Sequence, residues 1–397
     1  MNIRVLEPFC VKEEMKRIAV HPQGIEQLEN KACLYCLKIS GVNIKQANVI
    51  KQEALAVGAD AAVPYSVLNL ENKNVDIILM ATLKQYKKLV IKFAQQPFGL
   101  KNIGEEILKT IERYLHPSLA IKNIQKKFLI MGILNITPDS FSDGGMYFDN
   151  IDLAIKKAIQ MQEEGADIID IGGESSSFGV YFGDIYSGPV DEKEELRRIM
   201  PVIKRLRREL SCLISCDTSR SSVAKQALEE GVDIVNDIYA LKRDEQMAQI
   251  IAEAGCSVVL MHMQGTPETM QKNPFYYDVI GEICDFFRER IDFCINHNIN
   301  KNQIILDPGI GFGKRIEDNL EIIKRLREFT CFGLPLCLGT SRKSFIGKIA
   351  GGVSAEKRLP GTIATCAIGY INGARIFRVH DVIQAQQALK ITAEIYG

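Results

Sequence analysis

Short apolar runs alternate with longer amphipathic stretches from about residue 127 to the end of the chain at residue 397. The apolar runs are typical of buried strands, whereas the amphipathic stretches repeat apolar positions three and four residues apart, as helices do. Eight strand-helix units follow one another, with strands predicted at 128–136, 166–173, 212–219, 232–238, 257–263, 303–310, 334–341 and 374–380. This pattern predicts an α/β fold in which the strands close into a (β/α)8 TIM-type barrel.

An open doubly wound sheet is the alternative to the closed barrel. That fold usually has a glycine-rich phosphate turn after its first strand, and none follows 128–136. Polar residues also stand at the carboxyl end of nearly every predicted strand. They are Asn135, Glu174, Asp217, Asn236, His262, Asp307, Ser341 and His380. Barrel enzymes build their active sites at this end of the strands, so we expect the active site there.

Residues 1–120 have a different pattern and predict a small α/β domain. Strands are expected at 33–41 and 59–70, a strand-to-helix passage at 75–94, and amphipathic helices at 44–58 and 104–115. We place the border with the barrel, which spans 127–397, in the stretch 116–127. No cluster of catalytic residue types occurs in this domain, so its role stays open. Cys33 and Cys36 form a CxxC pair without a second pair, and we expect two buried structural thiols rather than a metal or redox site.

Composition narrows the possible partners. Lys plus Arg equals Asp plus Glu at 49 each, so no net charge draws the chain to nucleic acid or to an anionic membrane. No apolar stretch approaches the ~18–20 residues that a membrane-spanning helix needs. The 11 cysteines show no disulfide spacing, and the first residues lack a signal-type apolar run. We therefore expect a cytoplasmic protein with reduced thiols. Its oligomeric state stays open, with a homodimer among the possibilities.

The segment MGILNITPDSFSDGG, residues 131–145, passes from the first strand into a long polar loop. It resembles the opening signature of the dihydropteroate synthase family. Six further blocks resemble that family in the same order, at 165–175, 217–238, 258–267, 306–314, 339–347 and 378–382. An ordered set of blocks is far more specific than one motif. The resemblance implies a (β/α)8-barrel transferase of folate biosynthesis, and it does not extend to the first domain.

Asp217, Asn236 and Asp307 suit a pterin, because its pyrimidine edge presents N–H donors that carboxylates and amides accept. Each alone would often be a helix cap or a strand-end partner, but three at one barrel mouth favour function. The resemblance implies that all three bind the pterin. It also implies that Lys343 packs on the pterin and donates to its ring, and that Arg378 stacks on the pterin and acts in catalysis.

The other end of the substrate is expected to be a diphosphate. Ser341 and His380 lie in the SRKS and RVHDV blocks, and an imidazole at that place suits an anion. The resemblance implies that Asn135 helps to seat the diphosphate with its magnesium ion. Mg2+ prefers oxygen ligands and often binds through substrate phosphates, so no His or Cys cage is expected.

The reaction implied is the condensation of (7,8-dihydropterin-6-yl)methyl diphosphate with 4-aminobenzoate to give 7,8-dihydropteroate and diphosphate. Loss of diphosphate leaves a delocalised pterin cation that the amine captures, so no protein nucleophile is required. Lys343, Arg378, His380 and the first-loop residue Asp143 are the expected catalytic residues.

The second loop departs from the family pattern ESTRPG, because this chain reads Glu174-Ser175-Ser176-Ser177-Phe178-Gly179. Ser176, Ser177 and Phe178 are therefore expected at the diphosphate and aminobenzoate loops, with Ser177 in place of an arginine that pairs with Asp143. Phe178 replaces a rigid proline by a bulky ring. The chain is then either a working synthase with a remodelled loop or a relative with a different second substrate. A local misalignment is a third explanation.

Two rival functions remain. A pterin-dependent methyltransferase would present similar acid and amide residues but would not need a diphosphate site, so the SRKS and RVHDV blocks favour the synthase. A pterin-binding regulatory module, with the first domain as its output, would bind the pterin without turnover.

Overall fold

The computed structural model describes residues 3–69, 74–119, 121, 124, 126–137, 150–174, 181–182, 185–186 and 190–396. The chain divides into two compact units, Met1–Leu115 and His116–Gly397. No helix in the described ranges is both long enough and apolar enough to cross a membrane.

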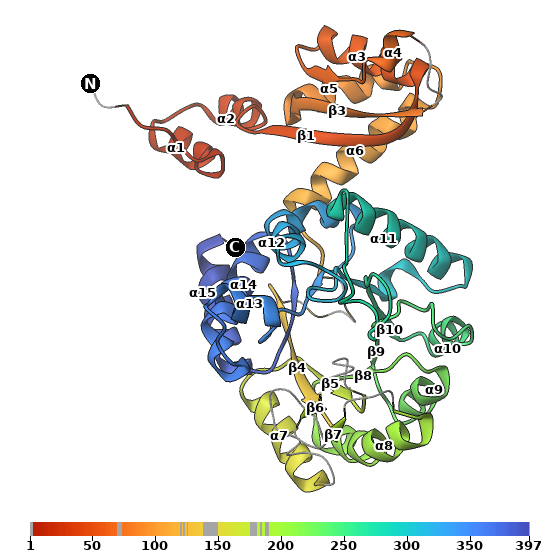
Figure 1. Ribbon diagram of the computed structural model, residues 1–397. Helices are drawn as coiled ribbons and strands as arrows, with labels where there is room; N and C mark the ends of the chain where they lie inside the picture. The colour runs from red at the N-terminus through yellow and green to blue at the C-terminus, as the bar shows by residue number, and fades with distance from the viewer. Residues whose placement is uncertain are drawn as a thin grey trace. The chain divides into compact units, whose positions relative to one another are not determined.

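The first unit is built on a three-stranded antiparallel sheet in the order β1-β3-β2. The strands are β1 (Leu34–Asn43), β2 (Asp60–Ala62) and β3 (Asn74–Thr82), and the helices that follow them are α3 (Ile44–Ala56), α4 (Ser66–Asn69), α5 (Leu83–Phe93) and α6 (Leu100–Leu115) (Figure 1). Three short helices precede the sheet, namely η1 (Pro8–Cys10), α1 (Val11–Arg17) and α2 (Pro22–Glu29). Alternate residues of β3 are buried, so one face of the sheet packs on the helices.

Two similar strand-to-helix passages tie this unit together. Asn43 and Gln46 form a capping box at the start of α3, and Thr82 and Gln85 form the same box at the start of α5. Each glutamine also reaches the turn that follows the other helix, because Gln46 Nε2 donates to the Phe98 carbonyl at 2.9 Å and Gln85 Nε2 donates to the Gly58 carbonyl. The start of α3 is therefore hydrogen-bonded to the turn after α5, and the start of α5 to the turn after α3.

The prediction that Cys33 and Cys36 are both buried is wrong. Cys36 lies in β1 and is exposed, and Cys33, just before the strand, is half-buried. Side chains alternate between the two faces of a strand. Tyr35 and Leu37 pack against the core of the first unit, and Cys36 between them lies on the opposite face. The error arose because an apolar composition was taken to mean burial on both faces.

The second unit contains eight parallel strands in the order β11-β10-β9-β8-β5-β4-β13-β12. They are β4 (Leu129–Asn135), β5 (Ile168–Gly172), β8 (Leu213–Asp217), β9 (Ile234–Asp237), β10 (Ser257–Met261), β11 (Ile304–Asp307), β12 (Cys337–Leu338) and β13 (Ile376–Val379). A parallel bridge between Leu306 and Leu336 joins the two ends of this order into a ring. The prediction of a (β/α)8 barrel is confirmed.

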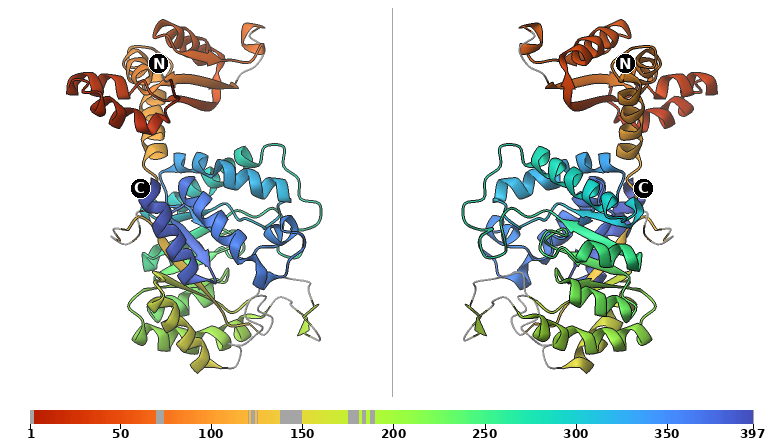
Figure 2. Two further views of the ribbon diagram at one scale, coloured as in Figure 1. Left: turned by 90° about the vertical axis from the view of Figure 1, so that its left-hand side faces the viewer. Right: turned by 90° about the vertical axis from the view of Figure 1, so that its right-hand side faces the viewer.

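Helices surround the strands in Figure 1, and Figure 2 shows the same unit from two sides, with helices on its outside. They are α7 (Ile151–Glu163), α8 (Glu192–Glu209), α9 (Ser221–Glu229), α10 (Met247–Ala254), α11 (Val279–Asn296), α12 (Ile316–Arg325), α13 (Ser344–Ile349), α14 (Leu359–Ile371) and α15 (Val382–Tyr396), with the short helices η2 (Lys301–Gln303), η3 (Leu326–Phe332) and η4 (Ala355–Arg358). The second loop contributes a small hairpin of β6 (Tyr181–Phe182) and β7 (Ile185–Tyr186).

The barrel strands are apolar on both faces, as expected where helices cover the outside and side chains fill the inside. One core cluster lies between strands and helices. A second cluster fills the amino-terminal end of the barrel with the residues Leu129, Met131, Ile168, Ile234, Val259, Ile305, Cys337 and Ile376. Ile121, which precedes the first barrel strand, is fully buried in this second cluster. Polar side chains lie at the carboxyl end of the barrel, opposite this second cluster.

Candidate active site

Arg378, at the carboxyl end of β13, is the centre of a buried polar cluster. Its Nε donates to Asp170 Oδ2 and its Nη2 donates to Asp217 Oδ2, both at 2.6 Å. Asn236 Nδ2 donates to the same oxygen of Asp170 at 3.1 Å. Four side chains from four different strands therefore converge inside the barrel mouth. The structure thus brings together Arg378, Asp217 and Asn236, which the sequence predicts, and adds Asp170.

Asp170 is the residue that the sequence analysis missed. It is fully buried on β5, and its other carboxylate oxygen has no hydrogen-bond partner among the residues described. A carboxylate is rarely buried unless it is paired, so its place inside the apolar run IIDIG was a signal that could have identified it. The strand-end pattern points to Glu174, whereas Asp170 lies two residues before the end of β5.

Asp217 and Asp307 are held in surroundings that favour their neutral forms. Burial raises the pKa of Asp217 to about 7, and Asp170 adds to this effect while the Arg378 charge opposes it. Burial also raises the pKa of Asp307, although the Gly309 N–H donates to its Oδ1 at 2.7 Å and opposes the shift. A ligand with N–H donors would relieve both groups, because it offers the ionised carboxylates new partners.

Lys343 is placed by a constrained turn after β12. The preceding residue, Arg342, has φ of 54°, which is unusual for a residue with a side chain. Its guanidinium pairs with both oxygens of Asp381, at 3.0 and 2.6 Å, and its backbone N–H donates to Thr362 Oγ1 at 2.9 Å. These bonds stabilise the turn that directs Lys343 toward the site.

The Lys343 ammonium lies 4.0 Å from the centre of the Phe312 ring, in a cation-π contact. Burial lowers the pKa of Lys343 to about 8, and the charge of Arg378 acts in the same direction. Asp307 and Asp217 oppose the shift, so Lys343 faces the carboxylates of the mouth. A lysine of this kind is a hydrogen-bond donor whose charge is sensitive to pH near 8.

His380 and Ser341 form a pair at the ends of β13 and β12. Ser341 Oγ accepts a hydrogen bond from the His380 backbone N–H at 3.1 Å and lies 2.9 Å from His380 Nδ1. Burial lowers the pKa of His380 to about 3, with the charges of Arg378 and Arg342 adding to the effect. The imidazole is therefore neutral, and in the tautomer whose Nδ1 accepts from the serine hydroxyl the proton is on Nε2. It can donate one hydrogen bond to an anion, but it supplies no positive charge.

Asn135 ends β4, and Gly172 of β5 lies between it and Asp217. A Cβ placed on Gly172 would lie 3.5 Å from the Asp217 Cβ and 3.7 Å from Asn135 Oδ1, so these two side chains flank that glycine. Asn135 offers one neutral oxygen, and the residues that the structure describes contain no group of three or more His, Cys, Asp or Glu side chains placed to hold a metal. This donor set fits a magnesium ion held mainly by substrate phosphates and water, and does not fit a protein cage.

Glu174, at the start of the second loop, is bound by arginine. Arg220 Nη1 donates to Glu174 Oε2 at 2.7 Å and also pairs with the fully buried Glu195. The same guanidinium donates to the Val190 carbonyl, at the far end of the loop. Arg220 thus joins both ends of this loop. The predicted site residues Asp143, Ser176, Ser177 and Phe178 lie outside the described residues.

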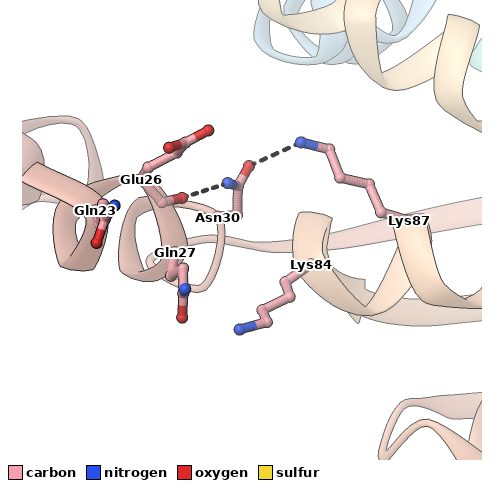
Figure 3. A pocket seen from close by; sticks show the side chains of 6 residues that line it. All are labelled: Gln23, Glu26, Gln27, Asn30, Lys84 and Lys87. Carbon is pink, nitrogen blue, oxygen red and sulfur yellow. Dashed lines mark hydrogen bonds between the residues drawn. The ribbon is translucent and has the colours of Figure 1, made fainter.

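A separate hollow of about 560 Å3 lies in the first unit, between α2 and α5. Its lining is polar, and in Figure 3 Asn30 joins the two helices by donating to the Glu26 carbonyl and accepting from Lys87. The remaining lining residues are Gln23, Gln27 and Lys84. No buried ionisable group faces this hollow, so the barrel mouth is the better candidate for catalysis.

The closed barrel and the buried charged cluster at its mouth define a (β/α)8 barrel with a polar site at the end where barrel enzymes carry out catalysis. Residues 131–380 match the family described as pterin binding enzyme. The chain is 44% identical over 271 residues to the dihydropteroate synthase of Synechocystis sp., covering 68% of this chain and 91% of that protein.

Solved structures agree with the sequence relatives. The dihydropteroate synthase of Clostridium difficile, determined in the presence of pteroic acid, is 45% identical with a TM-score of 0.62, covering 70% of this chain and 99% of that one. That of Xanthomonas albilineans, with 4-aminobenzoic acid, is 37% identical with a TM-score of 0.61, covering 67% and 92%. The chain belongs to the dihydropteroate synthase family of pterin-binding enzymes. The family match begins at residue 131, after the first unit.

Proposed function

We propose that this protein is a dihydropteroate synthase, a transferase that joins (7,8-dihydropterin-6-yl)methyl diphosphate to 4-aminobenzoate in folate biosynthesis. The observation that carries the proposal is the cluster of Arg378, Asp170, Asp217 and Asn236 inside a barrel that belongs to this family. The relative solved with 4-aminobenzoic acid supports that amine as the second substrate.

The pterin would lie in the barrel mouth with its pyrimidine edge on carboxylates and amides. Asp217, Asn236 and Asp307 would accept from or pair with its N–H groups, and Lys343 would donate to the opposite edge of the ring. A ligand without matching donors would not form these additional hydrogen bonds, at a cost of roughly 1–3 kcal/mol for each lost partner. This penalty would make the site selective for a pterin.

The diphosphate would lie toward Ser341 and His380. In the tautomer whose Nδ1 accepts from Ser341, His380 Nε2 would donate to a phosphate oxygen while Ser341 holds the ring. Asn135 would contribute one oxygen ligand to a magnesium ion that arrives with the substrate and supplies positive charge to the diphosphate.

The reaction would need no protein nucleophile. The bond between the exocyclic pterin carbon and the diphosphate oxygen breaks, and the electron pair leaves with the diphosphate. The amine nitrogen of 4-aminobenzoate then forms the new bond to that carbon, and one amine proton is released. The protein residues would stabilise the separated charges and exclude water from the cation.

We also propose that the enzyme works in the cytoplasm. All 11 cysteines are free thiols. Some of them are partly exposed, as expected in a reducing compartment.

The test is to incubate the protein with the dihydropterin methyl diphosphate, Mg2+ and 4-aminobenzoate, and to assay both products. Equal amounts of dihydropteroate and diphosphate are expected. Arg378→Met, which keeps the length of the side chain but removes the guanidinium, should abolish both. Binding of the pterin without any turnover would contradict the assignment and would favour a regulatory pterin-binding module.

A further inference from the structure

Lys314 is a buried lysine to which the proposed function gives no role. It lies between β11 and α12 and is only 4% exposed. Its ammonium donates to the Phe312 carbonyl at 3.0 Å and to the His262 carbonyl at 3.2 Å, and lies 2.9 Å from His262 Nδ1. An ammonium group has three hydrogens, and these three acceptors use all of them. Burial lowers the pKa of Lys314 to about 7. In its charged form, Lys314 is thus fully satisfied by the protein itself and has no hydrogen left for a substrate.

The state of His262 agrees with this arrangement. Burial lowers the pKa of His262 well below its ordinary value, and the charge of Lys314 adds to the effect. The imidazole is therefore neutral, and its Nδ1 keeps the lone pair that accepts from Lys314. The pair is a fixed hydrogen bond between two loops rather than an ion pair.

Those two loops follow β10 and β11 and are in close contact. Tyr276 Oη donates to the Gly313 carbonyl at 2.8 Å, and Gln271 Nε2 donates to the Gly311 carbonyl at 3.0 Å. A Cβ on Gly309 would lie 1.9 Å from the His262 carbonyl oxygen, so only glycine fits there. The loop after β11 therefore rests directly on the backbone of its neighbour.

The loop that Lys314 holds carries a group that faces the active site. The Phe312 ring supports the Lys343 ammonium at 4.0 Å. The Lys314 bond is made to the carbonyl of this same residue, Phe312. A continuous path of contacts thus runs from His262 through Lys314 and Phe312 to Lys343.

We propose that Lys314 is a positioning residue, which fixes the backbone of Phe312 and, through the Phe312 ring, sets where the Lys343 ammonium stands in the pterin site. The inference rests on the proposed function, because Lys343 is taken there to donate to the pterin. Lys314 acts through another residue and touches no substrate.

The first test compares Lys314→Met with Tyr276→Phe, which removes a hydrogen bond between the same two loops but at Gly313 instead of Phe312. Both are assayed well below their melting temperatures with saturating 4-aminobenzoate. For Lys314→Met the KM for the pterin diphosphate should rise about tenfold while kcat falls less than about threefold, because a small misplacement of a binding group weakens the ligand. Tyr276→Phe should change neither constant by more than about twofold. An unchanged KM in Lys314→Met, even with a lower melting temperature, would overturn the proposal.

The second test asks whether the effect passes through the Phe312 ring. Phe312→Leu removes the ring that supports Lys343, so Lys314→Met should add less than about a twofold change in that background. If the two substitutions multiply their effects on KM, Lys314 acts by another route and the proposal fails. Should Lys314→Met not fold, Lys314→Gln keeps one donor for a loop carbonyl and is compared in the same cycle.

A ligand measurement separates this inference from the proposed function. Calorimetry with the pterin diphosphate reports its affinity whether or not product forms. If the wild type binds the pterin without turnover, the proposed function fails, yet Lys314→Met should still weaken that binding about tenfold. An affinity equal to that of the wild type would reject the positioning role alone.

Discussion

Asp170→Asn gives the sharpest test of the electrostatics at the barrel mouth. The substitution keeps the shape of the side chain but removes a fully buried negative charge. The amide oxygen can still accept from Arg378 and Asn236, which now bond to one oxygen of Asp170. Asp170 is one of the groups that raise the pKa of Asp217, so the charge and the hydrogen bonds can be tested separately.

The magnitude follows from the titration of Asp217 near pH 7. If the pterin requires the ionised carboxylate, only about one site in ten is ready at pH 6, so pterin affinity should be about tenfold weaker at pH 6 than at pH 8, a difference of roughly 1.4 kcal/mol. Without the Asp170 charge the pKa of Asp217 falls, and the acidic limb should move about one unit to lower pH. Affinity at pH 8 should also fall, because Arg378 loses one charged partner.

The assay is calorimetric titration with a pterin that lacks the diphosphate, from pH 5 to pH 9. Asp217→Asn serves as the control, since removing the titrating group should remove the limb near pH 7. An acidic limb in Asp170→Asn at the wild-type pH, or at higher pH, would refute the reasoning, because the buried charge would then not act on Asp217.

Further expected outcomes concern the anion site, the barrel border and stability. His380→Ala should lower the affinity for pterins that carry a diphosphate but not for free pterin. Ser341→Ala should lower the same affinity about threefold to tenfold less, since it loses only the bond that orients the ring. Calorimetry with both ligands checks this. A chain of residues 116–397 should fold and retain activity. For a chain that begins at 125, the free energy of unfolding measured in urea should be roughly 2–5 kcal/mol lower, because the Ile121 side chain is missing from the barrel core. The folded state raises the pKa of Asp217. The free energy that this carboxyl adds to the stability of the unliganded barrel is therefore present below pH 4 and is lost as pH rises through about 7. Because the pterin is expected to bind the ionised form of Asp217, it should raise the melting temperature more at pH 8 than at pH 6.

The barrel could be predicted from the sequence because each strand is buried on both faces and is followed by an amphipathic helix. The first strand, predicted at 128–136, is β4 at Leu129–Asn135, and the last, predicted at 374–380, contains β13 at Ile376–Val379. The burial of Ile121 was not predictable, because the apolar residues of the short stretch 116–127, which include Ile121 and Ile124, follow neither a helical nor a strand period. Ile121 is buried in the amino-terminal opening of the barrel, which forms only when the eight strands close into a ring.

The polar residues of the mouth could be predicted as a group but not as pairs. Asp217, Asn236 and Arg378 lie on separate strands, and only the ring closure decides that Arg378 reaches Asp217 across the mouth. Asp170 was missed because it precedes the strand end. The neutral state of His380 could not be predicted from the sequence either, since it arises from burial and from the charges of Arg378 and Arg342.

The charges at the mouth finally bear on the leaving group. Arg378 is already paired with two carboxylates, Arg342 is paired with Asp381, and His380 is neutral. Each of these groups can donate hydrogen bonds, but their positive charge is largely compensated before a substrate enters. Lys343 is charged below its pKa of about 8, but the proposed function places it on the pterin. For the proposed reaction, a cation that arrives with the diphosphate would supply the missing charge, with the single oxygen of Asn135 as one ligand. We accordingly expect that chelation of Mg2+ stops product formation and weakens binding of the diphosphate, while the affinity for free pterin, measured by the same calorimetry, stays within about twofold. Equal turnover with and without the chelator would show that the residues of the mouth supply the required charge themselves.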